Sequence, residues 1–225
     1  MNSRTWMTSA FALVFSFSFA TACLAEREVK IFNGKDLKGW TKKGGAATYA
    51  VEDGVIVGRS APNTPNTFLA TDKEYGDFIL ELDFKIDEGE FNSGVQIRSH
   101  SKKKHKNGQV YGYQVEIDPL PRAYSGGIYF EGGSPEREGG WLQSLDGKDE
   151  ARKAFKHDDW NHFKIVAKGR HLQTWINGIP AADYTDKDEK AFIPKGFIAL
   201  QVHGVGPATD TREVRWKNIK LTVLE

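Results

Sequence analysis

The chain has 225 residues, with 31 Lys and Arg against 30 Asp and Glu, and 39% of its residues are hydrophobic. This length and composition fit one folded globular domain and exclude a disordered, collagenous or multi-span membrane chain. Because the net charge is close to zero, neither nucleic acid nor an anionic membrane is expected as a partner.

The N-terminal 25 residues have the pattern of a cleaved secretory signal. Residues 11–20 form an apolar run, Arg4 carries the only charge before Glu26, and small residues follow the run. The pattern predicts a signal peptide over 1–25, a single domain over 26–225 and a periplasmic or secreted protein. The single cysteine, Cys23, would leave with the signal, so no disulfide is expected; cleavage before Cys23, as in a lipoprotein, is the less favoured alternative. No segment has the roughly 20 apolar residues that a transmembrane helix needs.

Beyond residue 26, apolar residues recur mostly with a period of two, in short runs separated by Gly, Asn, Asp and Pro. This pattern predicts an all-β fold, with two antiparallel sheets packed face to face as a β-sandwich or jelly roll. The candidate strands are 47–51, 55–58, 78–86, 94–99, 111–118, 127–130, 161–168, 171–176, 196–203 and 213–223. One or two helical turns are expected within 147–156, and the polar segments 100–108 and 131–159 are expected to be solvated surface loops.

Successive side chains of a strand point to opposite faces of its sheet, so each candidate strand divides into an apolar and a polar set. The polar sets contain Glu81, Asn92, Gln96, Arg98, Gln114, Glu116, Asp118, Trp175, Gln201 and His203. If the strands are neighbours, these side chains form one patch that suits a sugar, which binds planar polar groups and an aromatic face. Any sheet with one wet face alternates in this way, but such a face usually holds Lys, Glu and Thr rather than so many amides.

Several motifs are absent from the sequence. It has no phosphate-binding loop, GxGxxG, HExxH, CxxC or GxSxG segment. Their absence argues against nucleotide-binding, zinc-protease and serine-hydrolase functions.

Two segments, Ile31-Phe-Asn-Gly-Lys-Asp-Leu-Lys-Gly-Trp40 and Gln173-Thr-Trp-Ile-Asn-Gly178, carry a family resemblance when taken together. With Tyr113–Asp118 and Gly126-Gly-Ile-Tyr129, they resemble the 3-keto-disaccharide hydrolase domain family over essentially the whole chain after the signal. The resemblance implies a concanavalin A-like sandwich, an exported bacterial protein and cleavage of glycosides oxidised at C3. The chain departs from the family where Tyr-Glu-Val-Gln is frequent: Gln114 and Glu116 exchange the amide and the carboxylate.

The chemistry that the resemblance implies is an elimination. A C3 ketone acidifies the C2 hydrogen, so a base can remove it, the C1 glycosidic oxygen can leave, and water can then add. The reaction needs a base at C2, a cation or hydrogen-bond donor at the C3 oxygen and an acid at the leaving oxygen. We assign His203 and Glu116 as base and acid, in either order, and Arg98 to the C3 oxygen. The expected substrate-binding residues are Glu81, Asn92, Gln96, Gln114, Asp118, Tyr129, Trp175 and Gln201.

The sequence requires no cofactor, although a divalent cation (Ca²⁺, Mn²⁺ or Mg²⁺) could be held by Glu116, His203 and Glu81. Two other functions remain open. One is a glycosidase of unoxidised glycans that uses Glu116 with Glu81 or Asp118 as its pair of carboxylates. The other is a carbohydrate-binding module without catalysis. The sequence predicts neither the exact glycoside nor the oligomeric state.

Overall fold

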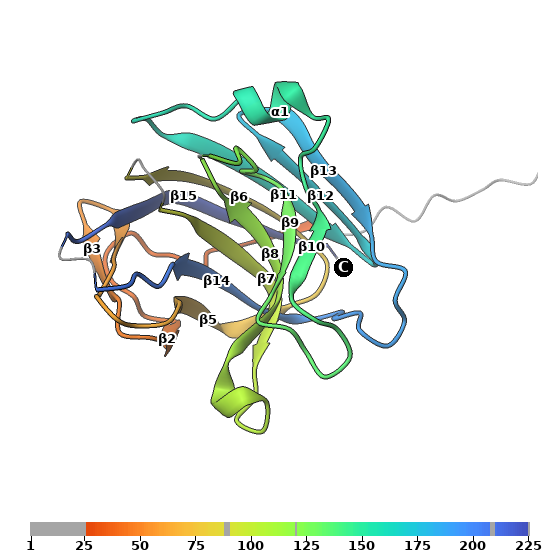
Figure 1. Ribbon diagram of the computed structural model, residues 1–225, viewed down its shortest axis with the longest axis horizontal. Coiled ribbons are helices and arrows are strands. Elements are labelled where there is room, and N and C mark those ends of the chain that lie inside the picture. The colour runs from red at the N-terminus through yellow and green to blue at the C-terminus, as the bar shows by residue number, and fades with distance from the viewer. Residues whose placement is uncertain (1–25, 88–90, 120, 208–209, 225) are drawn as a thin grey trace, which may run out of the picture.

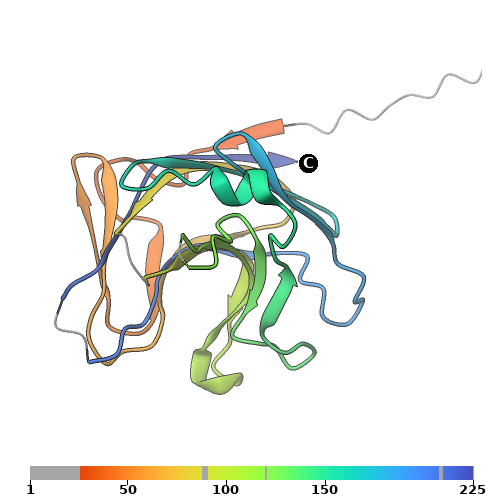
Figure 2. The same cartoon turned by 45° about the horizontal axis from the view of Figure 1, so that its top comes forward.

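The computed structural model describes residues 26–87, 91–119, 121–207 and 210–224, and these form two antiparallel sheets packed as layers (Figures 1 and 2). The predicted signal peptide and Cys23 lie outside the described residues. No helix in the described part of the chain has the length and apolar character to cross a membrane. The predicted all-β sandwich is confirmed.

The larger sheet has eight strands within the described residues. Its strands are β1 (Glu26–Val29), β3 (Thr48–Glu52), β4 (Val55–Arg59), β6 (Phe78–Ile86), β11 (Asn161–Lys168), β12 (His171–Ile176), β13 (Ile179–Thr185) and β15 (Glu213–Leu224). The strand order is β13-β12-β11-β6-β15-β4-β3, and β1 pairs with β15. In β6, buried apolar side chains alternate with half-buried ones, of which Glu81, Asp83 and Lys85 are charged, so one face of this sheet is buried and the other is in contact with solvent.

The smaller sheet has seven strands among the residues described. They are β2 (Trp40–Gly44), β5 (Thr67–Tyr75), β7 (Ser93–Ser101), β8 (Val110–Ile117), β9 (Ile128–Glu131), β10 (Gly140–Gln143) and β14 (Gly196–Val202). The order is β10-β9-β8-β7-β14-β5-β2. Every residue of β8 and β14 is buried, on the outer face of the sheet as well as the inner one. Because an uncovered face would be wet, other parts of the chain must cover this one.

All ten candidate strands are present, and five further strands had no clear period-two signal. β5 contains the consecutive apolar residues Phe68, Leu69 and Ala70, which are all buried, so its sequence does not alternate between apolar and polar residues. β1, β2, β10 and β13 are short edge or near-edge strands in which polar residues, glycine or proline interrupt the pattern. The helix expected within 147–156 is confirmed as α1 (Asp149–Lys153).

The expectation that 131–159 and 100–108 are only solvated loops is wrong in part. The first segment contains β10 and α1, and its first residue, Glu131, still belongs to β9. The second begins within β7 and includes a 3₁₀ turn, η1 (Lys106–Gly108), at the tip of the β7–β8 hairpin. Both segments flank the outer face of the smaller sheet, and this places them beside the site described below.

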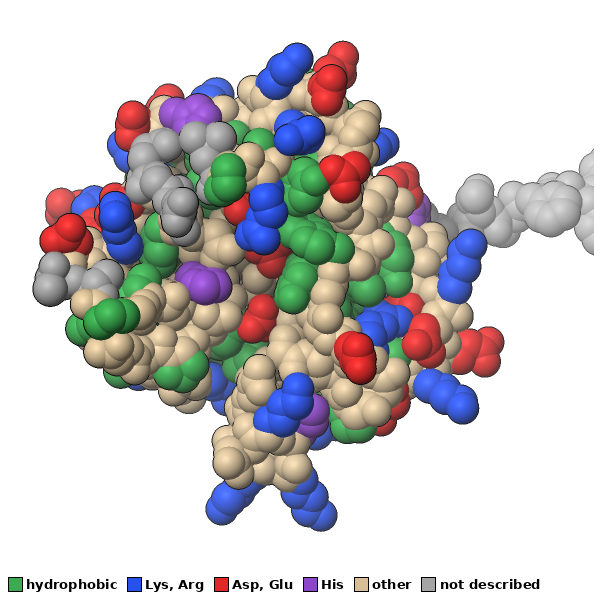
Figure 3. Space-filling model, viewed as in Figure 1, with side chains coloured by type: hydrophobic (Ala, Val, Ile, Leu, Met, Phe, Trp, Pro, Cys, Tyr) green, Lys and Arg blue, Asp and Glu red, His purple; other side chains and the backbone are tan. Residues whose placement is uncertain are grey.

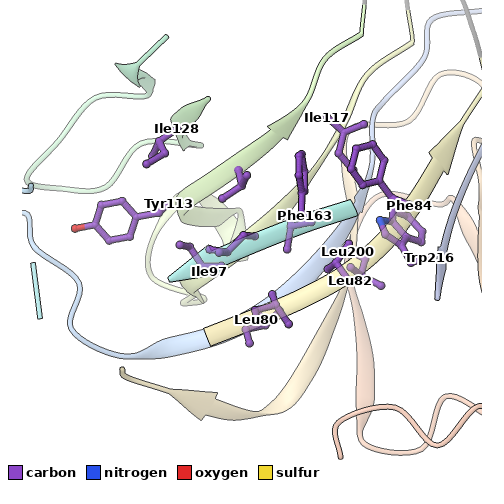
Figure 4. Packing of buried hydrophobic residues seen from close by; sticks show 14 of the residues in the cluster. Leu80, Leu82, Phe84, Ile97, Tyr113, Ile117, Ile128, Phe163, Leu200 and Trp216 are labelled. Carbon is purple, nitrogen blue, oxygen red and sulfur yellow. The ribbon is translucent and has the colours of Figure 1, made fainter. Parts of the chain in front are cut away.

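The hydrophobic core lies between the two sheets (Figure 4). Leu80, Leu82 and Phe84 from the larger sheet face side chains such as Ile97 and Leu200 from the smaller one, and all five are fully buried. Phe84 packs on Phe163 of β11 with ring centroids 4.4 Å apart. Burying each large apolar side chain stabilises the fold by roughly 1.5–3 kcal/mol, so this core supplies a rigid support for the outer face.

Candidate functional site

A pocket of about 330 Å³ opens on the outer face of the smaller sheet. The pocket is lined by Asn66, Asn92, Gln114, Glu116, Arg122, Tyr129, Glu131, Trp141, Gln201 and His203. Figure 3 shows this face, where acidic side chains lie in a hollow beside a histidine. The volume is at the lower end of the range for small-molecule sites, and the lining is strongly polar.

Glycine at position 94 opens the floor of the pocket. Gly94 pairs with Glu116 across β7 and β8, while Leu200 pairs with Val95, so the next residue, Gln201, lies beside Gly94. A Cβ atom on Gly94 would lie 2.5 Å from Cδ of Gln114, which is closer than Cβ atoms in proteins approach other heavy atoms. The side chain of Gln114 therefore occupies the space above Gly94, between Glu116 and Gln201.

A chain of amides below the pocket fixes Gln114. The hydroxyl of Ser99 donates to Oε1 of Gln96 at 2.6 Å, and Nε2 of Gln96 donates to Oε1 of Gln114. Nε2 of Gln114 in turn donates to Oε1 of Glu116 at 2.5 Å. Since each amide uses its oxygen as acceptor and its nitrogen as donor, the whole chain has one orientation.

Glu116 is a buried carboxyl, with only 4% of its surface exposed. The pKa of Glu116 is raised to about 8, mainly by burial and also by the nearby carboxylates of Glu131 and Asp118, while the hydrogen bond from Gln114 and the charge of Arg122 oppose the rise. A carboxyl in this state carries its proton at neutral pH and can donate it in a hydrogen bond.

His203, which follows β14 directly, contributes an imidazole in a defined tautomer. Its Nδ1 atom lies 2.7 Å from the carbonyl oxygen of Gly204. A carbonyl only accepts hydrogen bonds, so Nδ1 carries the proton, and in the neutral ring Nε2 keeps its lone pair. His203 can therefore act as a base through Nε2.

Arg122 brings a positive charge to the pocket. Its Nε atom lies 2.7 Å from Oδ2 of Asp118, an almost completely buried residue, and this ion pair fixes the position of the guanidinium. A guanidinium has two further nitrogens and can bind a ligand oxygen while this ion pair persists. The guanidinium also lies 5.8 Å from the ring of Trp141, which packs edge to face against Tyr129 at 5.4 Å. Together these two rings give the pocket an aromatic wall.

Two amide side chains have polar atoms that the described residues leave unsatisfied. Both the nitrogen and the oxygen of the Gln201 amide are buried without a hydrogen-bond partner, and so is the oxygen of Asn92. Burying an unpaired polar atom costs about 1–3 kcal/mol, so such atoms call for a partner. Both residues line the pocket, and a ligand rich in hydroxyls would supply the missing partners.

The structure brings together six of the residues that the sequence singled out. Asn92, Gln114, Glu116, Tyr129, Gln201 and His203 line the pocket. Gln96 lies beneath it and orients Gln114, and Asp118 holds Arg122, so both support the site without lining it.

Arg98, which we had assigned to the C3 oxygen, lies away from the pocket. The pairing of β7 and β8 shifts between Ile97 and His100, and Arg98 has a positive φ of 47° in this bulge, so the period-two argument fails there. The buried guanidinium donates to the carbonyl oxygens of Gly76 and Gly169 and pairs with Asp77 at 2.8 Å. These contacts tie the β5–β6 turn to the β11–β12 turn.

Glu81 and Trp175 also lie elsewhere, because β6 and β12 belong to the larger sheet. The cation site proposed from Glu116, His203 and Glu81 is therefore not assembled: Glu81 is on the other sheet. Throughout the described ranges, no group of three or more His, Cys, Asp or Glu side chains is arranged to hold a metal ion.

Four lining residues were missed in the sequence: Asn66, Arg122, Glu131 and Trp141. Only Glu131 had a usable signal, since it is two residues beyond Tyr129 on the same strand and so shares its face. Trp141 comes from the segment taken for a loop, which Arg137 anchors by two hydrogen bonds to the buried Asp186, at 2.7 and 2.9 Å. Arg122 and Asn66 lie in turns whose positions no periodicity predicts.

Three solved structures show the same fold. A Bacillus subtilis protein of unknown function with a galectin-like fold has a TM-score of 0.60 and 14% identity, covering 88% of this chain and 96% of its own. An inferred glycosyl hydrolase from Parabacteroides distasonis ATCC 8503 has a TM-score of 0.58 and 21% identity, with coverages of 88% and 94%. Carbohydrate-binding module CBM66 from Bacillus subtilis has a TM-score of 0.55 and 17% identity, with coverages of 80% and 93%.

A search of the curated proteins gives no match. The family comparison is decisive, since its match runs over residues 27–222, nearly the whole described chain. It agrees with the resemblance carried by the Ile31–Trp40 and Gln173–Gly178 segments, and it supports a carbohydrate-active protein. The chain belongs to the 3-keto-alpha-glucoside-1,2-lyase-like domain family.

Proposed function

We propose that this protein cleaves glycosides oxidised at C3, by removing the C2 proton and eliminating the C1 substituent. One observation carries the proposal: a single pocket combines the Nε2 lone pair of His203, the guanidinium of Arg122 and the protonated carboxyl of Glu116. Elimination next to a ketone needs a base and stabilisation of an enolate oxygen, and these groups supply both.

His203 is the base that takes the C2 proton through Nε2. Arg122 and the Glu116 proton together stabilise the negative charge that forms on the C3 oxygen, as a carboxyl kept neutral by burial can do. Gln114, Gln201 and Asn92 hold the sugar hydroxyls, and the wall of Trp141 and Tyr129 packs against the ring. Water then adds to the unsaturated sugar, and the net reaction is hydrolysis.

A second candidate is a glycosidase of unoxidised glycans. It is favoured by the carboxyl pair Glu116 and Glu131, which line one pocket and whose charges interact, since glycosidases use two carboxyl groups across the scissile bond. This pair replaces the Glu81 and Asp118 options, because Glu81 lies on the other sheet and Asp118 is paired with Arg122. A binding module without catalysis is the third outcome to test.

Proton NMR in D₂O separates these functions. Purified protein is incubated with a 3-keto-disaccharide and, as the control, its unoxidised parent, each before and after EDTA. Cleavage of the keto form alone, with deuterium entering at C2, is the expected result. Cleavage of the parent would establish the glycosidase instead, and binding without any cleavage would establish the module. A rate that falls with EDTA and returns with Ca²⁺, Mn²⁺ or Mg²⁺ would add a cation to the site.

The proposal includes export of the protein, based on the sequence of residues 1–25. Mass spectrometry of the protein recovered from its native host should give a chain that begins at Glu26. A chain that begins at a lipid-modified Cys23 would instead establish a lipoprotein.

A further inference from the structure

A second, larger cavity adjoins the pocket. It has a volume of about 800 Å³ and is lined by residues that include Thr64, Phe68, Lys106, Gln109, Val110 and Val205. Asn66 and Glu131 line both cavities. The outer face of the smaller sheet therefore carries two adjoining compartments, and the proposed function uses only the smaller one.

The larger cavity has an apolar floor and a polar rim. Phe68 and Val110 belong to a small apolar cluster, with Ala70, Phe197 and Ala199, that is separate from the main core. Thr64, Gln109 and Lys106 supply a hydroxyl, an amide and an ammonium group around this floor. A flat ring with an apolar face and hydroxyls at its edge matches this lining, and both a phenolic ring and a second pyranose have that chemistry.

Glu131 stands at the junction of the two compartments. Nδ2 of Asn66 donates to Oε1 of Glu131 at 3.1 Å, and the Asn66 oxygen accepts from the backbone amide of Gly204 at 2.8 Å. These two hydrogen bonds fix the orientation of the Asn66 amide, so that its nitrogen faces Glu131. Oε2 of Glu131 is then the oxygen that can carry a proton. Burial raises the pKa of Glu131, although the hydrogen bond from Asn66 opposes this effect.

We propose that the larger cavity is the leaving-group site, which takes the aglycone ring, and that Glu131 gives its proton to the departing glycosidic oxygen. This assignment rests on the proposed function. His203 takes the C2 proton, and the electrons of the C2–H bond form the enolate. When the C1–O bond breaks, the enolate electrons form the C1–C2 double bond and restore the C3 ketone, and the electron pair of the C1–O bond stays on the aglycone oxygen. The proton from Glu131 joins that oxygen, so the leaving group departs as a neutral alcohol.

The order of groups along the face agrees with the atoms of the sugar. Glu131 and Asn66 are at the junction, where C1 and its oxygen would lie. His203 lies next to this junction, since its Nδ1 donates a hydrogen bond to the carbonyl oxygen of Gly204, a residue that lines the larger cavity. Glu116 and Arg122 line only the smaller pocket, where C3 would lie.

The test of the cavity compares Gln109→Trp with Lys104→Trp. Gln109 is exposed and lines the cavity, while Lys104 is exposed on the same hairpin and does not line it. The substrates are methyl 3-keto-glucoside, phenyl 3-keto-glucoside and a 3-keto-disaccharide. Gln109→Trp should lower the kcat/KM ratio of phenyl to methyl glycoside about tenfold, as hydrophobic pockets discriminate, and Lys104→Trp should keep it. The substrate whose kcat/KM falls more in Gln109→Trp, the phenyl glycoside or the disaccharide, shows whether the cavity takes a phenolic ring or a second pyranose.

The test of Glu131 uses the variant Glu131→Gln with methyl and 4-nitrophenyl 3-keto-glucosides. An acid at the leaving oxygen matters for an alkoxide and little for nitrophenolate, so kcat/KM should fall about 10²-fold or more for the methyl glycoside and much less for the nitrophenyl one. Equal losses, or no loss with either, would overturn the role of Glu131. Cleavage by the wild type with both the phenyl-to-methyl and the disaccharide-to-methyl ratios unchanged in Gln109→Trp would overturn the leaving-group site, whereas no cleavage of any glycoside by the wild type would overturn the proposed function itself.

Discussion

The outer faces of the two sheets carry polar side chains in the same alternation, yet they differ in burial. On the larger sheet, the side chains of Glu81 and His162 are 37% and 43% exposed, and His162 pairs with Asp83 at 2.7 Å in the open. On the smaller sheet, Glu116 and Gln201 are 4% and 1% exposed. Equal patterns in sequence thus give a solvated surface on one side of the molecule and a chemical site on the other.

The difference comes from what covers each face. Trp141, Arg122 and Asn66 reach over the smaller sheet from turns and from an edge strand, and the β9–β10 segment is fixed by the Arg137–Asp186 ion pair. In a site shielded from water, electrostatic interactions are stronger and pKa values shift further. The four predictions below test whether burial, rather than residue type, separates the two faces.

The largest effect is expected from the two histidines. His203→Ala removes the base and should lower kcat/KM on a 3-keto-disaccharide by about 10²–10⁴-fold, the usual contribution of general base catalysis. His162→Ala, on the outer face of the larger sheet, is the matched control and should stay within about twofold. Steady-state kinetics on both variants, with circular dichroism to verify the fold, makes the comparison. Equal rates in the wild type and His203→Ala would remove this residue from the mechanism.

The second prediction concerns stability against pH. The pKa of Glu116 is raised from 4.5 to about 8 by burial, so the folded state binds a proton that the unfolded state has released between these values. The contribution of Glu116 to the free energy of unfolding should therefore be largest below pH 4.5 and fall as the pH rises to about 8, with a total loss of about 3–5 kcal/mol from this group. Urea unfolding at pH 5, 7 and 9 measures the slope.

Glu116→Gln should remove this loss, so that the variant is more stable than the wild type at pH 9 and close to it at pH 5. Glu81→Gln is the control on the other face, and it should keep the slope because Glu116 is still present. Glu131, whose pKa burial also raises, should leave a smaller slope in Glu116→Gln, whereas a slope unchanged from the wild type would show that Glu116 is not responsible.

The third prediction separates the two arginines that compete for the role at the C3 oxygen. Arg98→Met should destabilise the fold by about 1.5–3 kcal/mol, because it removes the buried guanidinium that binds the carbonyl oxygens of Gly76 and Gly169 and the carboxylate of Asp77. Its activity should fall only with the unfolded fraction. Arg122→Met should also destabilise the fold, because it leaves the almost completely buried carboxylate of Asp118 without its partner, but it should in addition lower kcat/KM in the protein that remains folded. Thermal unfolding and kinetics at a temperature well below Tm distinguish the two; a catalytic defect in folded Arg98→Met would contradict the assignment.

Much of the fold could be predicted because strand alternation is a local property. The bounds of β6, β11 and β12 were predicted to the residue, since each alternates cleanly between apolar and polar side chains. The same local signal placed Gln114, Glu116, Gln201 and His203 on polar faces. Where the signal is missing, as in β5 with its apolar residues on both faces, the strand was missed.

The rest depends on contacts between residues distant in the chain. The consecutive strands β6 and β7 enter different sheets, so one predicted patch became two faces, and Glu81 and Trp175 were separated from Glu116. No alternation predicts a bulge, which is why Arg98 was misplaced. The cover over the pocket, with Arg122 and Trp141, comes from turns and a short edge strand, and their positions are set by tertiary packing.

The smallest effect, and the closest match between the two faces, involves two tryptophans. Trp141 and Trp175 are both partly buried, and each lies near one cation, Arg122 at 5.8 Å and Lys164 at 5.4 Å. Only Trp141 lines the pocket. Trp141→Ala should raise KM for a 3-keto-disaccharide about threefold to tenfold, the worth of one aromatic contact, while Trp175→Ala should leave KM within about twofold. Since both rings are tryptophans and both lie near a cation, a difference in KM would be explained by the face they occupy. Equal KM values in the two variants would mean that the sugar does not pack against the wall of the pocket.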